Sequence, residues 1–133
     1  MSGIVNLTAL LKTMEPVINP GEYVFCSVSG SLEEYAPLHP LATFQEQEGL
    51  TLIVEKTAAQ SYGLEFEGPF RQITLSVHSS LDAVGLTAAV AQCLTEQGIS
   101  ANVVAAFYHD HLFVKTEHAQ AALNALVALA ASS

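Results

Sequence analysis

The sequence predicts an α+β protein built from two βαββαβ-like halves, and three observations support this expectation. Half of the 133 residues are apolar and only 13% are charged, so the chain can bury a core. Segments with the two-residue alternation of strands recur between segments with the i, i+3, i+4 spacing of helices. The elements follow a similar order in an N-terminal half, residues 1–70, and a C-terminal half, residues 71–133. Each half is small for an independent core, so we expect the halves to pack together or to complete each other's sheets.

The first half opens with a predicted short helix, which Pro16 ends because the residue before a proline avoids helical backbone. Its apolar stripe consists of Leu7, Leu10, Leu11 and Met14. Residues 23–28 are β-branched and aromatic and predict a buried strand, whereas residues 29–40 are expected to form a loop. Residues 42–48 and 50–55 predict two strands hinged at Gly49, and residues 57–62 a short helix that closes at Gly63.

The second half contains the strongest strand signal, because residues 72–78 alternate apolar and polar side chains without exception. Ser79 and Ser80 then offer cap oxygens for a helix that Gly98 is expected to end. Residues 100–109 and 111–115 predict two strands joined by a turn at Asp110, and Thr116 is expected to cap a final helix.

Charge and targeting signals restrict the classes of partner. The formal net charge is −9, which repels phosphate backbones and anionic lipid, so we expect neither a nucleic-acid partner nor a membrane partner. Cys26 and Cys93 lie in apolar runs and are expected to be reduced and buried. Neither a signal peptide nor an apolar stretch of about 20 residues is visible, which predicts a cytoplasmic protein.

The junction between the predicted strand 72–78 and the following helix is the strongest candidate binding site. The first N–H groups of a helix lack intrahelical partners and carry partial positive charge, which suits a carboxylate. Ser80, Asp82 and Asn102 could accept from an ammonium group, and Gly85 leaves room for a ligand. Together these groups suit an amino acid. The structural alternative is that a serine only caps the helix and that Gly85 permits close packing.

Catalytic and metal sites are weaker hypotheses. His109 and His111 flank Asp110, but a closed zinc site needs four ligands, and the sequence suggests a turn between two histidines instead. Ser79 beside His78 is badly placed for nucleophilic catalysis, because neighbouring residues of a strand point to opposite faces. The phosphate-binding glycine patterns and the G-x-S-x-G nucleophile pattern are absent. We therefore expect no enzyme activity, no cofactor and no metal, with a hydrolytic or metal-dependent enzyme as the remaining alternative.

Two segments, "VHSSLDAVGLTAAV" and "GISANVVAAFYHDHLFV", resemble the ACT class of amino-acid-binding regulatory domains. With "YVFCSV" and "EGLTLIVE" in the first half, the chain is similar to small stand-alone bacterial proteins that pair two ACT-like halves. This resemblance implies a ferredoxin-like βαββαβ fold in each half, with an antiparallel sheet and helices on one face. The first half lacks an opening strand and the second a closing one, so strand exchange between halves or chains is expected.

The resemblance to aspartokinase regulatory domains also implies a site and a function. The effector would lie at a domain interface, which implies a homodimer, and no enzyme follows on this chain, which implies a regulated protein in trans. The alternative is a structural pairing module with a vestigial ligand site. The implied ligand-binding positions are Ser80, Leu81, Asp82, Ala83, Gly85, Leu86, Thr87, Ala101, Asn102 and Val103.

Overall fold

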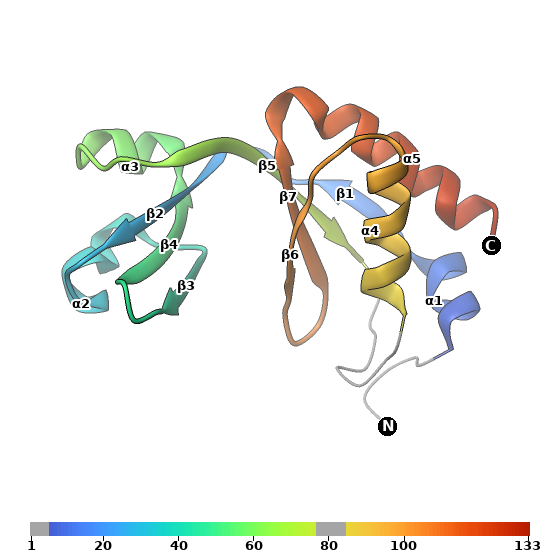
Figure 1. Ribbon diagram of the computed structural model, residues 1–133, viewed down its shortest axis with the longest axis horizontal. Helices are drawn as coiled ribbons and strands as arrows, with labels where there is room; N and C mark the ends of the chain where they lie inside the picture. The colour runs from blue at the N-terminus through green and yellow to red at the C-terminus, as the bar shows by residue number, and fades with distance from the viewer. Residues whose placement is uncertain (1–5, 77–84) are drawn as a thin grey trace. The chain divides into compact units, whose positions relative to one another are not determined.

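A computed structural model describes residues 6–76 and 85–133 of the chain (Figure 1). The chain forms two compact units. The central unit is Gly21–Phe70, and the terminal unit combines the residues up to Pro20 with Arg71–Ser133. The packed units therefore group the first 20 residues differently from the expected division at residue 70. In the described residues, no helix is both long enough and apolar enough to cross a bilayer.

The central unit is a βαββαβ arrangement with an antiparallel sheet in the order β3-β4-β2-β5. Strand β2 pairs with β4 over six residues, from Tyr23 opposite Glu55 to Val28 opposite Leu50. The elements are β2 (Tyr23–Val28), α2 (Leu32–Tyr35), the 3₁₀ turn η1 (Ala36–Leu38), β3 (Ala42–Gln45), β4 (Leu50–Glu55), α3 (Lys56–Ser61) and the first part of β5 (Glu67–Leu75).

The core of the central unit comes from alternate side chains of β2 and β4. In an antiparallel sheet every second side chain shares one face, and one such set meets α3 and η1. Val24, Leu52, Val54 and Ala59 are fully buried in this cluster. The structure confirms the predicted strands in β2 and β4, and it confirms the helix at α3 to within one residue.

Residues 29–40 are not the loop that the sequence predicts. Ser31 caps α2, with its Oγ accepting a hydrogen bond from the Glu34 N–H at 3.3 Å. Two glutamates in the first turn, Glu33 and Glu34, suit the positive end of this helix. The η1 turn that follows is held by Leu38, which is buried in the central core. A single anchoring leucine explains why the apolar pattern gave no helical period.

The terminal unit has a second antiparallel arrangement, in the order β1-β5-β7-β6. Its sheet pairs Pro16–Ile18 with Leu75–Ile73 at one edge and Asn102–Ala105 with Phe113–Asp110 at the other. The elements are α1 (Leu7–Thr13), β1 (Pro16–Ile18), the second part of β5, α4 (Leu86–Glu96), β6 (Asn102–Ala105), β7 (Asp110–Lys115), the 3₁₀ turn η2 (Thr116–His118) and α5 (Ala119–Ala131).

Strand β1 was not predicted, and its pairing with β5 explains why each half of the sequence was expected to lack a strand. It is the closing strand that residues 71–133 lack, supplied from the start of the same chain. Strand β5 closes the central sheet through Glu67 and Phe70 and opens the terminal sheet from Ile73 onward. The exchange therefore takes place within one chain. Proline at the first position of an edge strand is compatible with this role, because its missing N–H is not needed there.

The helices of the terminal unit lie together on one side of its strands (Figure 1). Ile73 and Leu75 of β5 and Leu112 and Val114 of β7 meet this layer and are almost completely buried. The helices contribute Leu10, Leu11 and Met14 from α1, Leu86, Val90 and Leu94 from α4, and Ala119, Ala122 and Leu126 from α5. The α+β fold class and the helices on one face of an antiparallel sheet are thus confirmed.

Several boundaries differ from the predictions for local reasons. The hairpin between β6 and β7 closes earlier than expected, because the Ala106 N–H donates to the His109 carbonyl at 3.1 Å. Asp110 is therefore a strand residue opposite Ala105 instead of a turn residue. Gly98 ends α4 as predicted, with φ of 71° and its N–H bonded to Thr95 at 2.9 Å. Helix α5 begins at Ala119, after the η2 turn that starts at Thr116.

The assignment of α1 to the terminal unit is testable by substitution. Leu10 has no exposed surface, and Leu10→Ala should reduce the stability of the terminal unit by about 2–5 kcal/mol. Amide hydrogen exchange should then become faster in β7 and α5 while β2 and β4 keep their protection. The matched control is Thr8→Ala on the exposed side of α1. Faster exchange in β2 and β4, with β7 unchanged, would contradict the assignment.

Candidate functional site

Six of the ten expected ligand-binding residues lie in the described chain. Gly85, Leu86 and Thr87 form the start of α4, and Ala101, Asn102 and Val103 form the start of β6. The expected positions Ser80, Leu81, Asp82 and Ala83 lie outside the described residues, as do His78 and Ser79.

Gly85 is the N-cap of α4, so neither Ser79 nor Ser80 has that role. Its φ of 104° lies in a region that residues other than glycine avoid. A Cβ added at Gly85 would lie 3.2 Å from Cδ2 of Leu7 in α1, which is tighter than an ordinary contact. The backbone conformation therefore favours glycine at this position, and the Leu7 side chain would have to shift by a few tenths of an ångström to admit a Cβ.

The first turn of α4 presents backbone donors without a side-chain cap. The first intrahelical bond runs from the Ala89 N–H to the Gly85 carbonyl at 2.8 Å. The preceding N–H groups, those of Leu86, Thr87 and Ala88, precede the helical ladder and point toward the helix start. Leu86 itself is buried in the terminal core, whereas Thr87 is exposed. At this end a ligand would therefore meet main-chain donors and the Thr87 side chain.

The second group of expected residues lies far from the first within one terminal unit. Helix α4 runs between them and contains 11 residues, which corresponds to about 16 Å of helix. Asn102 is exposed, and its Nδ2 donates to the Phe113 carbonyl across the hairpin at 3.3 Å. Ala101 and Val103 pack against the terminal core. The structure does not bring the two groups together in a single chain.

A polar network that sequence reasoning missed crosses the terminal sheet on the face away from the helices. Nδ1 of His111 lies 3.0 Å from the Thr74 hydroxyl and 3.2 Å from Nε2 of Gln72. The Thr74 hydroxyl in turn accepts from Nδ2 of Asn19 at 2.8 Å. With Nε2 of Gln72 as the donor, we infer that Nδ1 of His111 accepts and that the proton of the neutral ring is on Nε2. The polar positions of the alternating strand 72–78 were the available signal.

Burial shifts the pKa values of His111 and Asp110 in opposite directions. Burial lowers the pKa of His111, His109 lowers it further, and Asp110 opposes the shift. Burial raises the pKa of Asp110, while His111 and His109 act against that rise. The His109 and His111 rings are 6.5 Å apart. Within the part of the chain that the structure describes, no group of three metal-ligating side chains is present.

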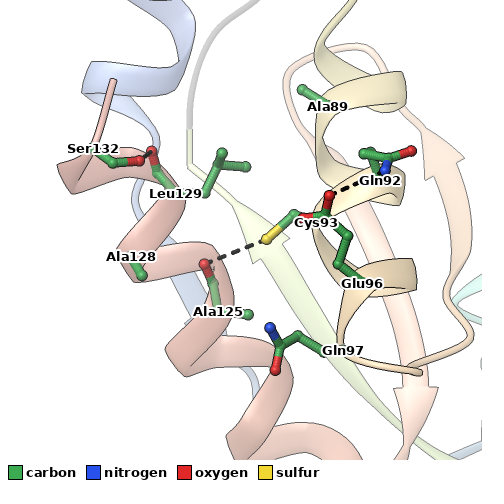
Figure 2. A pocket seen from close by; sticks show the side chains of 9 residues that line it. All are labelled: Ala89, Gln92, Cys93, Glu96, Gln97, Ala125, Ala128, Leu129 and Ser132. Carbon is green, nitrogen blue, oxygen red and sulfur yellow. Dashed lines mark hydrogen bonds between the residues drawn. The ribbon is translucent and has the colours of Figure 1, made fainter.

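A shallow groove of about 510 Å³ lies between α4 and α5 (Figure 2). Its lining residues are Ala89, Gln92, Cys93, Glu96, Gln97, Ala125, Ala128, Leu129 and Ser132. Sγ of Cys93 donates to the Ala125 carbonyl at 3.5 Å, and Gln92 donates to Glu96 at 3.1 Å. Burial and then Glu96 raise the pKa of Cys93, which favours the protonated thiol. Both cysteines are free, as expected, although Cys93 is only half-buried.

Two further hollows lie in the central unit. One, of about 430 Å³, follows the outer part of β2 beside residues 65–67, and a smaller one of about 260 Å³ lies at the start of α3. Neither hollow, nor the groove between α4 and α5, is lined by Gly85, Thr87 or Asn102.

Comparison with known proteins identifies the family. A family model described as an ACT domain matches residues 2–71, and a second ACT domain model matches residues 67–128. The chain belongs to the ACT domain family. Domains of this family are regulatory, and they bind amino acids. The overlap of the two matches, residues 67–71, falls within β5, the strand that both units share.

Solved structures agree with this assignment. A protein of unknown function from Vibrio cholerae, described as a "Possible Transport Protein", is 56% identical, with a TM-score of 0.87, over 93% of this chain and 95% of that one. A protein from Agrobacterium tumefaciens is 17% identical, with a TM-score of 0.75, over 88% and 89%. The regulatory subunit of aspartate kinase from Thermus flavus is 11% identical, with a TM-score of 0.68, over 89% and 99%. No curated protein matches the chain significantly.

The polar network predicts a pH dependence of stability. A histidine whose pKa is lower in the folded state binds protons more readily when unfolded, so its stabilising contribution is complete above about pH 6.5 and is lost below it. His111→Asn retains an acceptor for Thr74 and Gln72 but removes the titration. Between pH 8 and pH 5.5 the native chain should lose more stability than this variant, by about 1 kcal/mol or less.

Urea unfolding at the two pH values measures this difference. Asp110 has a raised pKa and so opposes the trend at lower pH, but it is present in both proteins. His118→Asn, in the η2 turn, is the matched control for removal of a histidine. Equal pH dependence in the native chain and in His111→Asn would contradict the proposed protonation state.

Proposed function

We propose that the chain is a non-catalytic regulatory module that binds an amino acid and acts on a partner protein in trans. It would work in the cytoplasm as a homodimer. Two ACT domain matches that together cover residues 2–128 support the regulatory class. The Thermus flavus protein that is similar in fold is a regulatory subunit of aspartate kinase, so it is a regulatory protein on a chain of its own.

The observation that carries the site is the glycine-capped start of α4. Gly85 leaves the first helical N–H groups without a side-chain cap, and these donors suit the carboxylate of an amino acid. Asp82 is proposed to take the ammonium group. With Ser80, Leu81, Ala83, Leu86 and Thr87 it completes this side of the site.

A second copy of the chain is proposed to supply Ala101, Asn102 and Val103. Within one terminal unit, helix α4 separates these residues from Gly85. An interface that places the start of β6 against the start of α4 of another copy would bring the two groups together. Binding would then stabilise one packing of the copies by the difference in affinity between the two states.

A structural pairing module is the second candidate function. The bond from Asn102 to the Phe113 carbonyl favours it, because that amide is already used within its own hairpin. In this case the ACT surfaces would serve only for association with another protein. Ligand-dependent stability separates the two functions.

The experiment is a thermal-shift panel of the twenty amino acids at millimolar concentration. A ligand present at 100 times its dissociation constant adds about 2.7 kcal/mol to the stability of the folded state. We expect one amino acid, as its L-form, to raise the melting temperature. No shift with any of the twenty would favour the pairing module.

The site assignment is tested by substitutions at the two glycines that flank α4, Gly85 and Gly98. Gly85→Val should abolish the shift, because a side chain at φ of 104° is strained and would meet Leu7 of α1, which displaces the helix start that supplies the donors. Gly98→Val is the control, since Gly98 also has positive φ, 71°, but nothing lies near its missing Cβ. Gly85→Ala is the milder substitution, should Gly85→Val unfold the terminal unit. An unchanged ligand shift in Gly85→Ala and Gly85→Val would exclude this location.

A further inference from the structure

Strand β2 uses only part of the edge that faces β5. It pairs with β4 along all six residues, but with β5 only at Tyr23, opposite Phe70, and Phe25, opposite Glu67. The register shifts between these two pairs, and β5 begins at Glu67. Among the described residues, none pairs with the outer part of β2 on this side. The edge is therefore open for the last residues of the strand.

The hydrogen-bonding direction of β2 identifies the free backbone groups. The Lys56 N–H donates to the Glu22 carbonyl at 3.0 Å, so the backbone N–H and carbonyl of Glu22 point toward β4. The backbone groups of successive strand residues point to alternate edges, so those of Val24, Cys26 and Val28 also point toward β4. The backbone groups of Ser27 point away from β4, to the part of the edge that β5 does not occupy. Its N–H and carbonyl have no strand partner in the described chain.

A groove of about 430 Å³ lies at this open edge. It is lined by Phe25, Cys26, Ser27, Thr51, Glu65, Phe66 and Glu67. The Phe25 ring packs edge to face on Phe70, with ring centroids 5.3 Å apart, and this pair fixes the inner end of the groove. The groove thus combines an unpaired strand edge, aromatic walls and hydroxyl groups.

The charge of the groove is negative. Glu65 and Glu67 are exposed carboxylates on its wall. The chain has four basic residues. In the central unit, Nζ of Lys56 lies 3.9 Å from Oε1 of Glu22. In the terminal unit, the Arg71 guanidinium donates to the Asn19 carbonyl at 2.9 Å. Lys12 and Lys115 also belong to the terminal unit. No described cation of the central unit pairs with the groove carboxylates.

We propose that this edge binds an extended, basic segment of a partner protein. The segment would continue the sheet as a short strand, with its backbone bonded to the N–H and carbonyl of Ser27. A Lys or Arg side chain of the segment would pair with Glu65 or Glu67. A second copy of the chain is the less suitable occupant of this groove, because a chain with four basic residues against thirteen acidic ones offers few cations to pair with Glu65 and Glu67.

This interaction is independent of the proposed amino-acid site. All of the groove residues lie in the central unit, whereas Gly85, Thr87 and Asn102 lie in the terminal unit. Its experiment can therefore fail while the amino-acid panel succeeds, and the reverse also holds.

The probe is a capped six-residue peptide of alternating lysine and valine, titrated calorimetrically into the full chain at low salt. We expect a sub-millimolar dissociation constant and slower hydrogen exchange at the Ser27 amide. N-methylation of the peptide amides on one edge should weaken binding at least tenfold, and methylation on the other edge should not. Backbone pairing on a single edge is the property that a merely electrostatic contact lacks.

Paired charge variants test the location. Glu65→Gln with Glu67→Gln should weaken binding on the order of tenfold. Glu33→Gln with Glu48→Gln removes the same charge from exposed positions of the central unit outside the groove and should change little. The proposal is overturned by any of three results: no binding of the basic peptide, equal binding of a glutamate–valine peptide, or equal effects of the two variant pairs. An unchanged Ser27 amide would also overturn it.

Discussion

Backbone pairing along β5 is the constraint on which both units depend. A four-stranded βαββαβ sheet needs a closing strand beside its opening strand, and the described residues supply seven strands for two such sheets. Strand β5 serves twice, through Glu67 and Phe70 in the central sheet and through Ile73 and Leu75 in the terminal sheet. Because β5 opens the terminal sheet, that sheet must be closed by another segment, which is β1.

The position of β1 determines the rest of the terminal unit. Helix α1 precedes β1 directly, so it is brought to the helical layer, where Leu10, Leu11 and Met14 join the core. At its other end, α1 places Leu7 beside Gly85. The close approach of Leu7 to Gly85 is thus a consequence of strand exchange. The candidate site at the start of α4 and the exchanged N-terminal segment therefore meet where Leu7 lies beside Gly85.

The sequence predicts the elements whose signals are local. Residues Ile73 and Leu75 alternate with polar neighbours, and Gly98 ends α4 as its positive φ requires. Strand β1 has only three residues and a proline, so no local pattern marks it, and only pairing with Leu75–Ile73 creates it. The same holds for the network at His111, since Thr74 and Gln72 are 37 and 39 positions away. The separation of Asn102 from Gly85 also depends on tertiary structure, because it follows from the path of α4.

The exchange of β1 has a consequence for synthesis of the protein. Translation proceeds toward the C-terminus, so α1 and β1 leave the ribosome before their partners in β5, β7 and α5, which follow by tens of residues. The central unit, a continuous segment from Gly21 to Phe70, is complete before that point. Until the last helix emerges, the apolar stripe of Leu10 and Leu11 has no core to enter. Helix α1 and strand β1 are therefore made before the central unit but packed after it, and their apolar side chains stay exposed on the nascent chain in the interval.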